Sequence, residues 1–148
     1  MARIRRILHA TDFSRGSRAA FRRAVEMAKA NRAELFLAHV MVPIMIPMAE
    51  AYVSADIYDR IEESTRAAGL AQLEQLRGQA RKAGIRARIL LLDGIAHERI
   101  VQAARRYRVD VIAVGTHGRT GLTKLFLGSV AGRVLAAARC PVMTVRGT

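Results

Sequence analysis

The chain is 148 residues long, is 51% hydrophobic and carries a formal net charge of +13. Its length and hydrophobic content suit one domain, residues 1–148, with a packed core, and they exclude an intrinsically disordered chain. No apolar run reaches the roughly 20 residues of a membrane helix, and the apolar N-terminal stretch is too short for a secretory signal. The single cysteine, Cys140, excludes an internal disulfide and suits the cytoplasm.

Segments with strand patterns alternate with segments of helical periodicity along the whole chain. The predicted strands are 5–11, 33–42, 86–93, 110–115 and 141–145. Between them, apolar residues recur at helical spacing in four stripes, which comprise Phe21, Ala24, Val25 and Ala28, then Ile57, Ile61, Ala68, Leu73 and Ala80, then Ile100, Val101, Ala104 and Tyr107, and finally Val130, Ala131, Val134, Leu135 and Ala138. This alternation predicts a single α/β domain in which helices cover both faces of a parallel sheet.

The carboxyl ends of two predicted strands carry polar and glycine-rich sequences. Thr11-Asp12 follows the first strand, and a long connection, 115–129, follows the fourth. Most strand-to-helix loops have about 2–6 residues, and much longer ones are usually functional. Parallel sheets bind ligands outside the carboxyl ends of their strands, so we expect the site at this edge.

The connection 115–129 has the composition of a phosphate-binding loop. Glycines let a ligand approach the backbone, and we expect Gly118 and Gly128 to bring N–H groups against phosphates. Gly128-Ser129 opens the fourth helix, where unpaired N–H groups and the helix dipole favour anions. Arg119 and Lys124 add positive charge within the loop. A purely structural glycine-rich turn is the alternative.

Five segments of the chain resemble the universal stress protein family, specifically its ATP-binding type. The strongest is the pattern G-x2-G-x9-G-[ST], formed by Gly115, Gly118, Gly128 and Ser129. The others are 7–14, 37–40, 94–101 and Cys140-Pro141-Val142. The resemblance covers nearly the whole chain and implies a five-stranded parallel sheet in the order 3-2-1-4-5.

The resemblance also implies a nucleotide site. Adenine would lie near Val40, the ribose near Asp12 and Gly115, and the phosphates along Gly118 and the start of the fourth helix, with Mg²⁺ or Mn²⁺ possible beside them. The candidate nucleotide-binding residues are Ala10, Thr11, Asp12, Val40, Gly115, Thr116, His117, Gly118, Arg119, Gly128, Ser129 and Val130. One departure is Gly132, which stands where the family often has an acidic residue that completes a capping box.

Several of these residues have a second interpretation. Asp12 suits a ribose hydroxyl or a hydrated Mg²⁺, or it caps the first helix. His9 and His39 lie inside apolar strands and are predicted to be hydrogen-bonded core residues. His117 either orders the glycine loop or touches the ligand. The apolar segment 43–53 folds over the adenine, docks against a partner, or packs on its own domain.

The positive charge indicates either a solvated protein surface or a nucleic-acid-binding site, and we favour the solvated surface. Arginines are scattered over the predicted solvated sides of three helices, and aromatic residues do not interleave with them as in single-strand binders. We expect only non-specific, salt-sensitive nucleic-acid binding and no membrane association. The arginines in question are Arg15, Arg18, Arg22, Arg23, Arg77, Arg81, Arg105, Arg106 and Arg108, together with Lys82.

The sequence therefore predicts an ATP-binding stress-response or regulatory protein, with hydrolysis slow or absent and no catalytic residue assigned. The alternatives are a genuine ATPase or phosphotransferase that uses Asp12 and Mg²⁺, and a basic nucleic-acid-binding protein. The fifth strand lies at a sheet edge, and the family resemblance implies that a homodimer forms there through Val142, Met143 and Val145.

Overall fold

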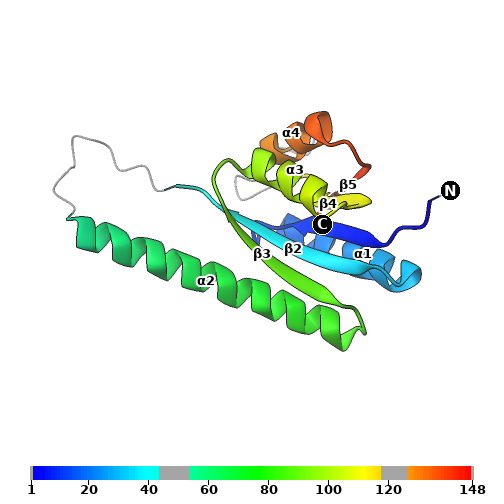
Figure 1. Cartoon of the computed structure of the whole chain (residues 1–148), viewed down its shortest axis with the longest axis horizontal. Helices are drawn as coiled ribbons and strands as arrows, with labels where there is room; N and C mark the ends of the chain where they lie inside the picture. The colour runs from blue at the N-terminus through cyan, green and yellow to red at the C-terminus, as the bar shows by residue number, and fades with distance from the viewer. Residues whose placement is uncertain (1, 44–53, 118–126, 148) are drawn as a thin grey trace.

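A five-stranded parallel sheet forms the centre of the fold in the computed structural model, which describes residues 2–43, 54–117 and 127–147 (Figure 1). The strand order is β3-β2-β1-β4-β5, so the predicted order and fold class are confirmed. The elements in chain order are β1 (Arg6–Ala10), α1 (Arg15–Asn31), β2 (Glu34–Met41), α2 (Ala55–Lys82), β3 (Ala87–Asp93), α3 (Ala96–Arg106), β4 (Val111–Gly115), α4 (Ser129–Ala137) and β5 (Val142–Val145).

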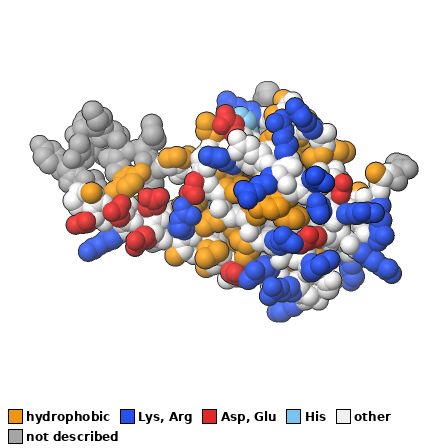
Figure 2. All heavy atoms as spheres, viewed as in Figure 1, with side chains coloured by type: hydrophobic (Ala, Val, Ile, Leu, Met, Phe, Trp, Pro, Cys, Tyr) orange, Lys and Arg blue, Asp and Glu red, His pale blue; other side chains and the backbone are white. Residues whose placement is uncertain are grey.

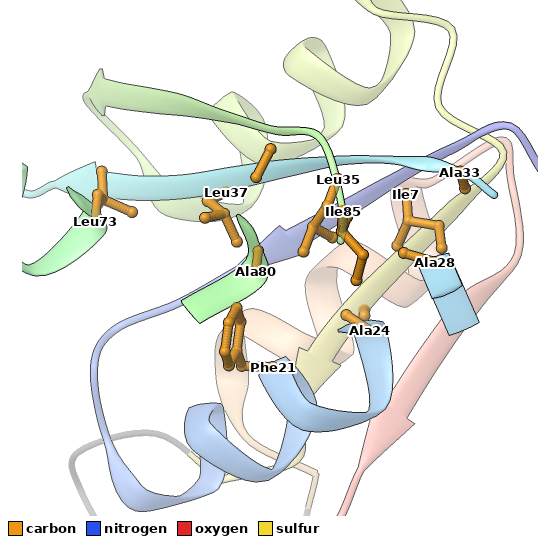
Figure 3. Packing of buried hydrophobic residues seen from close by; sticks show 12 residues of the cluster. Ile7, Phe21, Ala24, Ala28, Ala33, Leu35, Leu37, Leu73, Ala80 and Ile85 are labelled. Atoms are coloured by element: carbon orange, nitrogen blue, oxygen red, sulfur yellow. The ribbon is translucent and has the colours of Figure 1, made fainter. Parts of the chain in front are cut away.

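Helices α1 and α2 cover one face of the sheet, and α3 and α4 cover the other. Side chains alternate between the two faces along a strand, so Ile7 and Leu8 of β1 enter different cores. Figure 3 shows the first core, where Phe21 of α1 and Leu73 of α2 pack beneath the strands. In the second core, Val134 of α4 packs with the buried side chains of β1, β2 and β4.

The predicted apolar stripe of α2 is wrong in its N-terminal half. Leu73 and Ala80 are buried, but Ile57 and Ile61 are 49% and 42% exposed. The reason is length, since 28 residues of helix span about 42 Å whereas the seven residues of β3 span about 23 Å. Figure 1 shows the N-terminal half of α2 extending past the carboxyl edge of the sheet.

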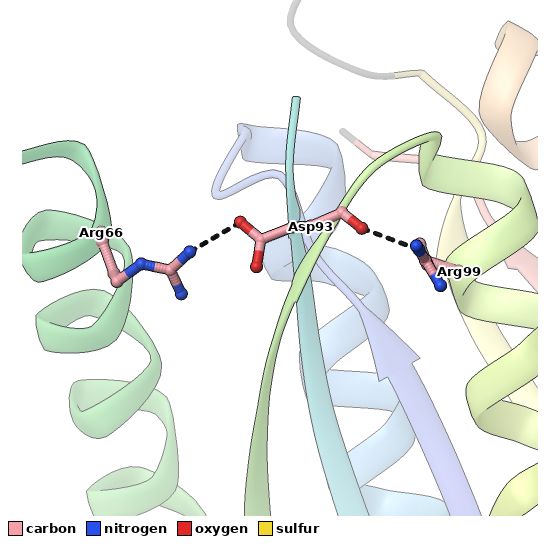
Figure 4. Close-up of polar contacts among 3 residues, drawn as sticks. All are labelled: Arg66, Asp93 and Arg99. Carbon is pink, nitrogen blue, oxygen red and sulfur yellow. Dashed lines mark hydrogen bonds and ion pairs between the residues drawn. The ribbon is translucent and has the colours of Figure 1, made fainter. Parts of the chain in front are cut away.

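An ion pair from α2 and a hydrogen bond from α3 join these helices to the end of β3. The Arg66 guanidinium donates to Asp93 Oδ1 at 2.8 Å, and Arg99 Nε donates to the Asp93 carbonyl oxygen at 2.7 Å. Figure 4 shows the two arginines approaching Asp93 from opposite sides. The next residue, Gly94, has a φ of +127°, a conformation that glycine adopts without strain. These contacts fix the turn that leads into α3.

The basic side chains lie mainly in solvent, as predicted. Figure 2 shows lysines and arginines spread over the visible face, with acidic side chains gathered over the N-terminal half of α2. Of the ten basic residues expected on solvated helix sides, only Arg77 is partly buried, and it pairs with Glu74. None of the described helices is long and apolar enough to cross a membrane.

Candidate functional site

A cavity of about 250 Å³ opens at the carboxyl edge of the sheet, and we call it the edge cavity. It lies where β1 and β4 are neighbours and their connections leave in opposite directions, the place where such sheets bind ligands. It brings together every described residue of the predicted site, namely Ala10, Thr11, Asp12, Val40, Gly115, Thr116, His117, Gly128, Ser129 and Val130. Gly118, Arg119 and Lys124 lie outside the described residues, as does the segment 44–53.

Eight further residues line the edge cavity and were missed by sequence reasoning. They are Ser17, Ala38, His39, Val42, Ala96, Ile100, Val114 and Ala131. Most are small or apolar, and they come from the ends of β2 and β4 and the starts of α1, α3 and α4. They could have been predicted from the strand order 3-2-1-4-5 that the family resemblance implies, because this order brings these ends of strands and helices together. The part of the cavity wall that α3 contributes, Ala96 and Ile100, is apolar.

Asp12 both lines the edge cavity and braces the start of α1. Its Oδ1 accepts hydrogen bonds from the Ser14 N–H at 2.9 Å and from the Ser17 hydroxyl at 2.7 Å. Ser14 is the N-cap of α1, and its hydroxyl oxygen accepts from the Ser17 N–H. The interpretation of Asp12 as the helix cap is therefore wrong, because Ser14 is the cap; Asp12 instead holds Ser14 and Ser17 in place, and it lies beside the cavity.

His39 holds the loop between β1 and α1. Its Nδ1 lies 2.8 Å from the Thr11 carbonyl oxygen, to which it must donate because a carbonyl only accepts. The imidazole also packs against the Phe13 ring, 4.5 Å between centroids. Phe13 has a φ of +64°, and its N–H donates to Thr11 Oγ1. His39 is hydrogen-bonded as predicted, but the prediction of a core residue is wrong, because His39 is only partly buried and itself lines the edge cavity.

His9 is completely buried on β1, as predicted. Its Nδ1 donates to the Ala113 carbonyl oxygen at 3.2 Å, and its ring lies 5.8 Å from that of Phe21. Within the described part of the chain, Nε2 has no hydrogen-bond partner. Burial lowers the pKa of His9 from 6.5 to about 4, against the smaller raising effects of the Ala113 carbonyl and Asp12. His9 is therefore a neutral core residue.

Three glycines bring backbones into direct contact beside the edge cavity. A Cβ on Gly16 would lie 2.6 Å from the His117 carbonyl oxygen, and one on Gly115 would lie 2.9 Å from the Gly16 carbonyl carbon and oxygen. A Cβ on Gly147 would lie 2.8 Å from the Gly16 Cα. The start of α1 is therefore packed against the end of β4 and the segment after β5. Only residues without a Cβ permit this approach.

A matched pair of Gly→Ala substitutions should have opposite effects on stability. Gly16→Ala should lower the free energy of unfolding by roughly 1–3 kcal/mol because the methyl group meets backbone that cannot rotate away. Gly78→Ala, inside α2 with no atom within 4 Å of its Cβ, should raise it by roughly 0.5–1 kcal/mol. Urea unfolding of both variants checks this, and a Gly16→Ala protein as stable as wild type would contradict the close contact.

The start of α4 presents unpaired backbone donors to the edge cavity. Its N-cap, Gly128, makes no side-chain cap, and the first intrahelical bond runs from the Gly132 N–H to the Gly128 carbonyl. Within the described ranges, the N–H groups of Ser129, Val130 and Ala131 have no acceptor, and all three residues line the cavity. Such N–H groups, with the positive end of the helix dipole, favour an anion.

The role of Gly128 differs from the prediction in one detail. Its own N–H donates to the Thr116 carbonyl oxygen and so is not free for a phosphate. This bond instead ties the start of α4 to the end of β4. No group of three or more potential metal ligands exists among the described residues, and Asp12 is the only carboxylate among the described residues lining the cavity.

This fold defines a small doubly wound α/β domain with a cavity at the topological switch point. The model of the universal stress protein family matches residues 3–146. The universal stress protein YxiE of Bacillus subtilis is 32% identical over 145 residues, which cover 95% of this chain and 98% of that protein. The chain therefore belongs to the universal stress protein family.

Solved structures of the family share this architecture. That of MJ0577, a universal stress protein of Methanocaldococcus jannaschii, superimposes with a TM-score of 0.85 at 25% identity and covers 99% of both chains. A member from Arabidopsis thaliana, solved with AMP bound, has a TM-score of 0.70 at 24% identity over 97% of this chain and 92% of that one.

Proposed function

We propose that this protein binds an adenine nucleotide, ATP foremost, in the edge cavity, and acts as a nucleotide-dependent stress-response or regulatory protein. The observation that carries the proposal is that the N–H groups of Ser129, Val130 and Ala131 have no acceptor within residues 2–43, 54–117 and 127–147. The AMP bound by the Arabidopsis member supports adenine nucleotides as the class to test. Val40 and Ile100 contribute apolar wall for a base, and the Asp12 carboxylate suits ribose hydroxyls or hydrated Mg²⁺.

Calorimetric titration with ATP, AMP and adenosine tests this proposal. Affinity should fall in that order, because each lost phosphate removes acceptors for the N–H groups of α4. Repeating the ATP titration with EDTA measures how much Mg²⁺ adds. Adenosine binding as tightly as ATP would contradict a phosphate site at α4, and no binding of any of the three would refute the proposal.

Hydrolysis is proposed to be slow or absent. Positioning of phosphate by backbone N–H groups is only one part of phosphoryl-transfer catalysis, which also needs a group that orients the attacking water. Among the described lining residues, the one carboxylate is Asp12, which the proposal already assigns to ribose hydroxyls or to hydrated Mg²⁺. Phosphate release should therefore be far below the enzyme median of about 10 per second. A burst of phosphate in a single-turnover experiment would favour the ATPase alternative instead.

A homodimer through β5 is proposed as the assembly. Among the described strands, β5 has only β4 as a neighbour, so its outer edge is unpaired, and Val142, Met143 and Val145 are only partly buried. Thr144→Pro should yield a monomer, because the register with β4 turns the N–H of Thr144 toward the outer edge, and proline removes this donor. Sedimentation velocity at micromolar concentration checks this, and a monomeric wild-type protein would overturn it.

The cytoplasm is proposed as the location.

A further inference from the structure

A second cavity lies on the other face of the sheet, between α1 and α2, and we call it the α1–α2 groove. Its volume is about 400 Å³, and Thr11 and Ser17 line both it and the edge cavity. Its polar rim consists of Arg18 and Arg22 from α1 and Gln72, Gln75 and Gln79 from α2, and its apolar part consists of Phe13, Phe21 and Leu76. The β1–α1 loop thus separates two distinct sites.

The charge of the α1–α2 groove is positive and uncompensated. The guanidinium groups of Arg18 and Arg22 form no hydrogen bond or ion pair with any described residue, and no carboxylate is among the groove's described lining residues. The nearest acidic residues along the two helices are already engaged, Glu26 with Arg23 at 2.9 Å and Glu74 with Arg77 at 2.6 Å. An occupant with negative charge would meet two unpaired guanidinium groups.

The glutamines distinguish between kinds of anionic occupant. Gln72, Gln75 and Gln79 follow the spacing of one helix face, and they span about 10 Å along α2. Each amide both donates and accepts hydrogen bonds, as a peptide backbone does. A DNA backbone offers phosphate acceptors but no donors for the glutamine carbonyl oxygens, and an RNA backbone offers only its 2′-hydroxyl groups as donors.

The aromatic residues of the groove also argue against nucleic acid. Phe21 is only 6% exposed, and the Phe13 ring already packs on His39. Neither offers a free face on which a base can stack, which is how single-strand binders hold their ligands. With Leu76, these rings instead form an apolar floor suited to the side chains of a polypeptide.

We propose that the α1–α2 groove binds an acidic segment of a partner protein in an extended conformation. Arg18 and Arg22 pair with its carboxylates, and Gln72, Gln75 and Gln79 bond to its backbone. The proposal does not depend on the nucleotide site, because the groove's charged residues lie on the opposite face of the sheet from α4.

Fluorescence anisotropy with a short labelled peptide of alternating glutamate and alanine tests the proposal at about physiological ionic strength, where long-range attraction is screened. The groove variant is Arg18→Gln/Arg22→Gln, and the control is Arg105→Gln/Arg108→Gln, which removes the same charge from exposed residues at the end of α3. We expect the groove variant to bind at least about tenfold more weakly and the control to stay within about twofold of wild type.

The other outcomes decide against the proposal. Equal losses in both double variants would mean that the peptide is attracted by net charge alone, and no binding to wild type would refute the groove as a site. Tighter binding of a single-stranded oligonucleotide that is lost in the groove variant would assign the groove to nucleic acid. Wild-type self-association lost in the groove variant would assign it to a second copy of this chain. Because the two arginines are exposed and unpaired, the variants should fold, which circular dichroism checks.

Discussion

Replacing Gly128 by valine should lower the affinity for ATP by at least about a hundredfold, or about 2.7 kcal/mol, while leaving the fold intact. Gly128 has φ −55° and ψ 152°, values that any residue adopts. The valine side chain would stand at the entry to α4, in front of the unpaired N–H groups of Ser129, Val130 and Ala131. Calorimetric titration with ATP measures the loss.

The control for this substitution is Gly132→Ala in the same helix. Its Cβ would lie 3.7 Å from Leu127 Cδ2, an ordinary contact, and it would improve helix propensity. ATP affinity should not change, and stability should rise slightly. If Gly128→Val bound ATP as well as wild type, the phosphate site at α4 would have to be abandoned.

Asp12 and Lys124 should matter less than Gly128, in that order. Asp12→Ala would remove both the carboxylate and the brace on Ser14 and Ser17, so Asp12→Asn is the sharper variant because its amide oxygen still accepts those bonds. Lys124→Ala should have the smallest effect, since a flexible lysine adds charge without fixing geometry.

Acidification should destabilise this protein through His9. Burial lowers the pKa of His9 to about 4, whereas the unfolded chain keeps a pKa near 6.5. Between these values the unfolded state binds more protons, so stability falls as the pH drops through 6.5 and the loss is complete below about 4. The contribution of this one residue is at most about 3 kcal/mol.

Urea unfolding of wild type and His9→Leu at intervals from pH 7 to pH 4 isolates this effect. Other titrating groups act in both proteins, so the difference between the two curves belongs to His9. The leucine variant should lose less stability on acidification, and His97→Gln, which keeps the buried imidazole, should behave as wild type. Parallel curves for wild type and His9→Leu would show that His9 does not titrate as its burial requires.

The local patterns of the sequence predicted most of the fold. Buried strands such as residues 33–42 are nearly continuous apolar runs, and the Ser14 cap and the α1 stripe follow short-range rules that tertiary contacts did not override. The stripe of α2 failed at Ile57 and Ile61, because periodicity tells which face of a helix is apolar but not whether the sheet extends far enough to cover it. It also failed at Ala68, beside the buried Gly69, and the stripe of α4 failed at the exposed Val130 and Leu135.

The site residues that stand at the ends of strands and helices could be predicted from the sequence. The site residues whose role depends on contacts between distant segments could not. Asp12, Gly115 and Ser129 stand at element ends, where spacing and chemistry indicate a ligand. Gly16 and Gly147 gave no such signal, since their role is a backbone contact between segments distant in sequence. The Gly128 N–H was misassigned for the same reason, because its acceptor, the Thr116 carbonyl, lies across a long connection.

The most direct test of the nucleotide site is a titration of ¹⁵N-labelled protein with ATP, followed by the backbone N–H resonances. Saturable shifts should be largest at Ser129, Val130 and Ala131, which line the edge cavity and whose N–H groups have no acceptor among the described residues. Smaller shifts are expected at Val40 and Gly115. If ATP left the resonances of α4 unmoved, or shifted chiefly those of the α1–α2 groove, the central claim would be contradicted.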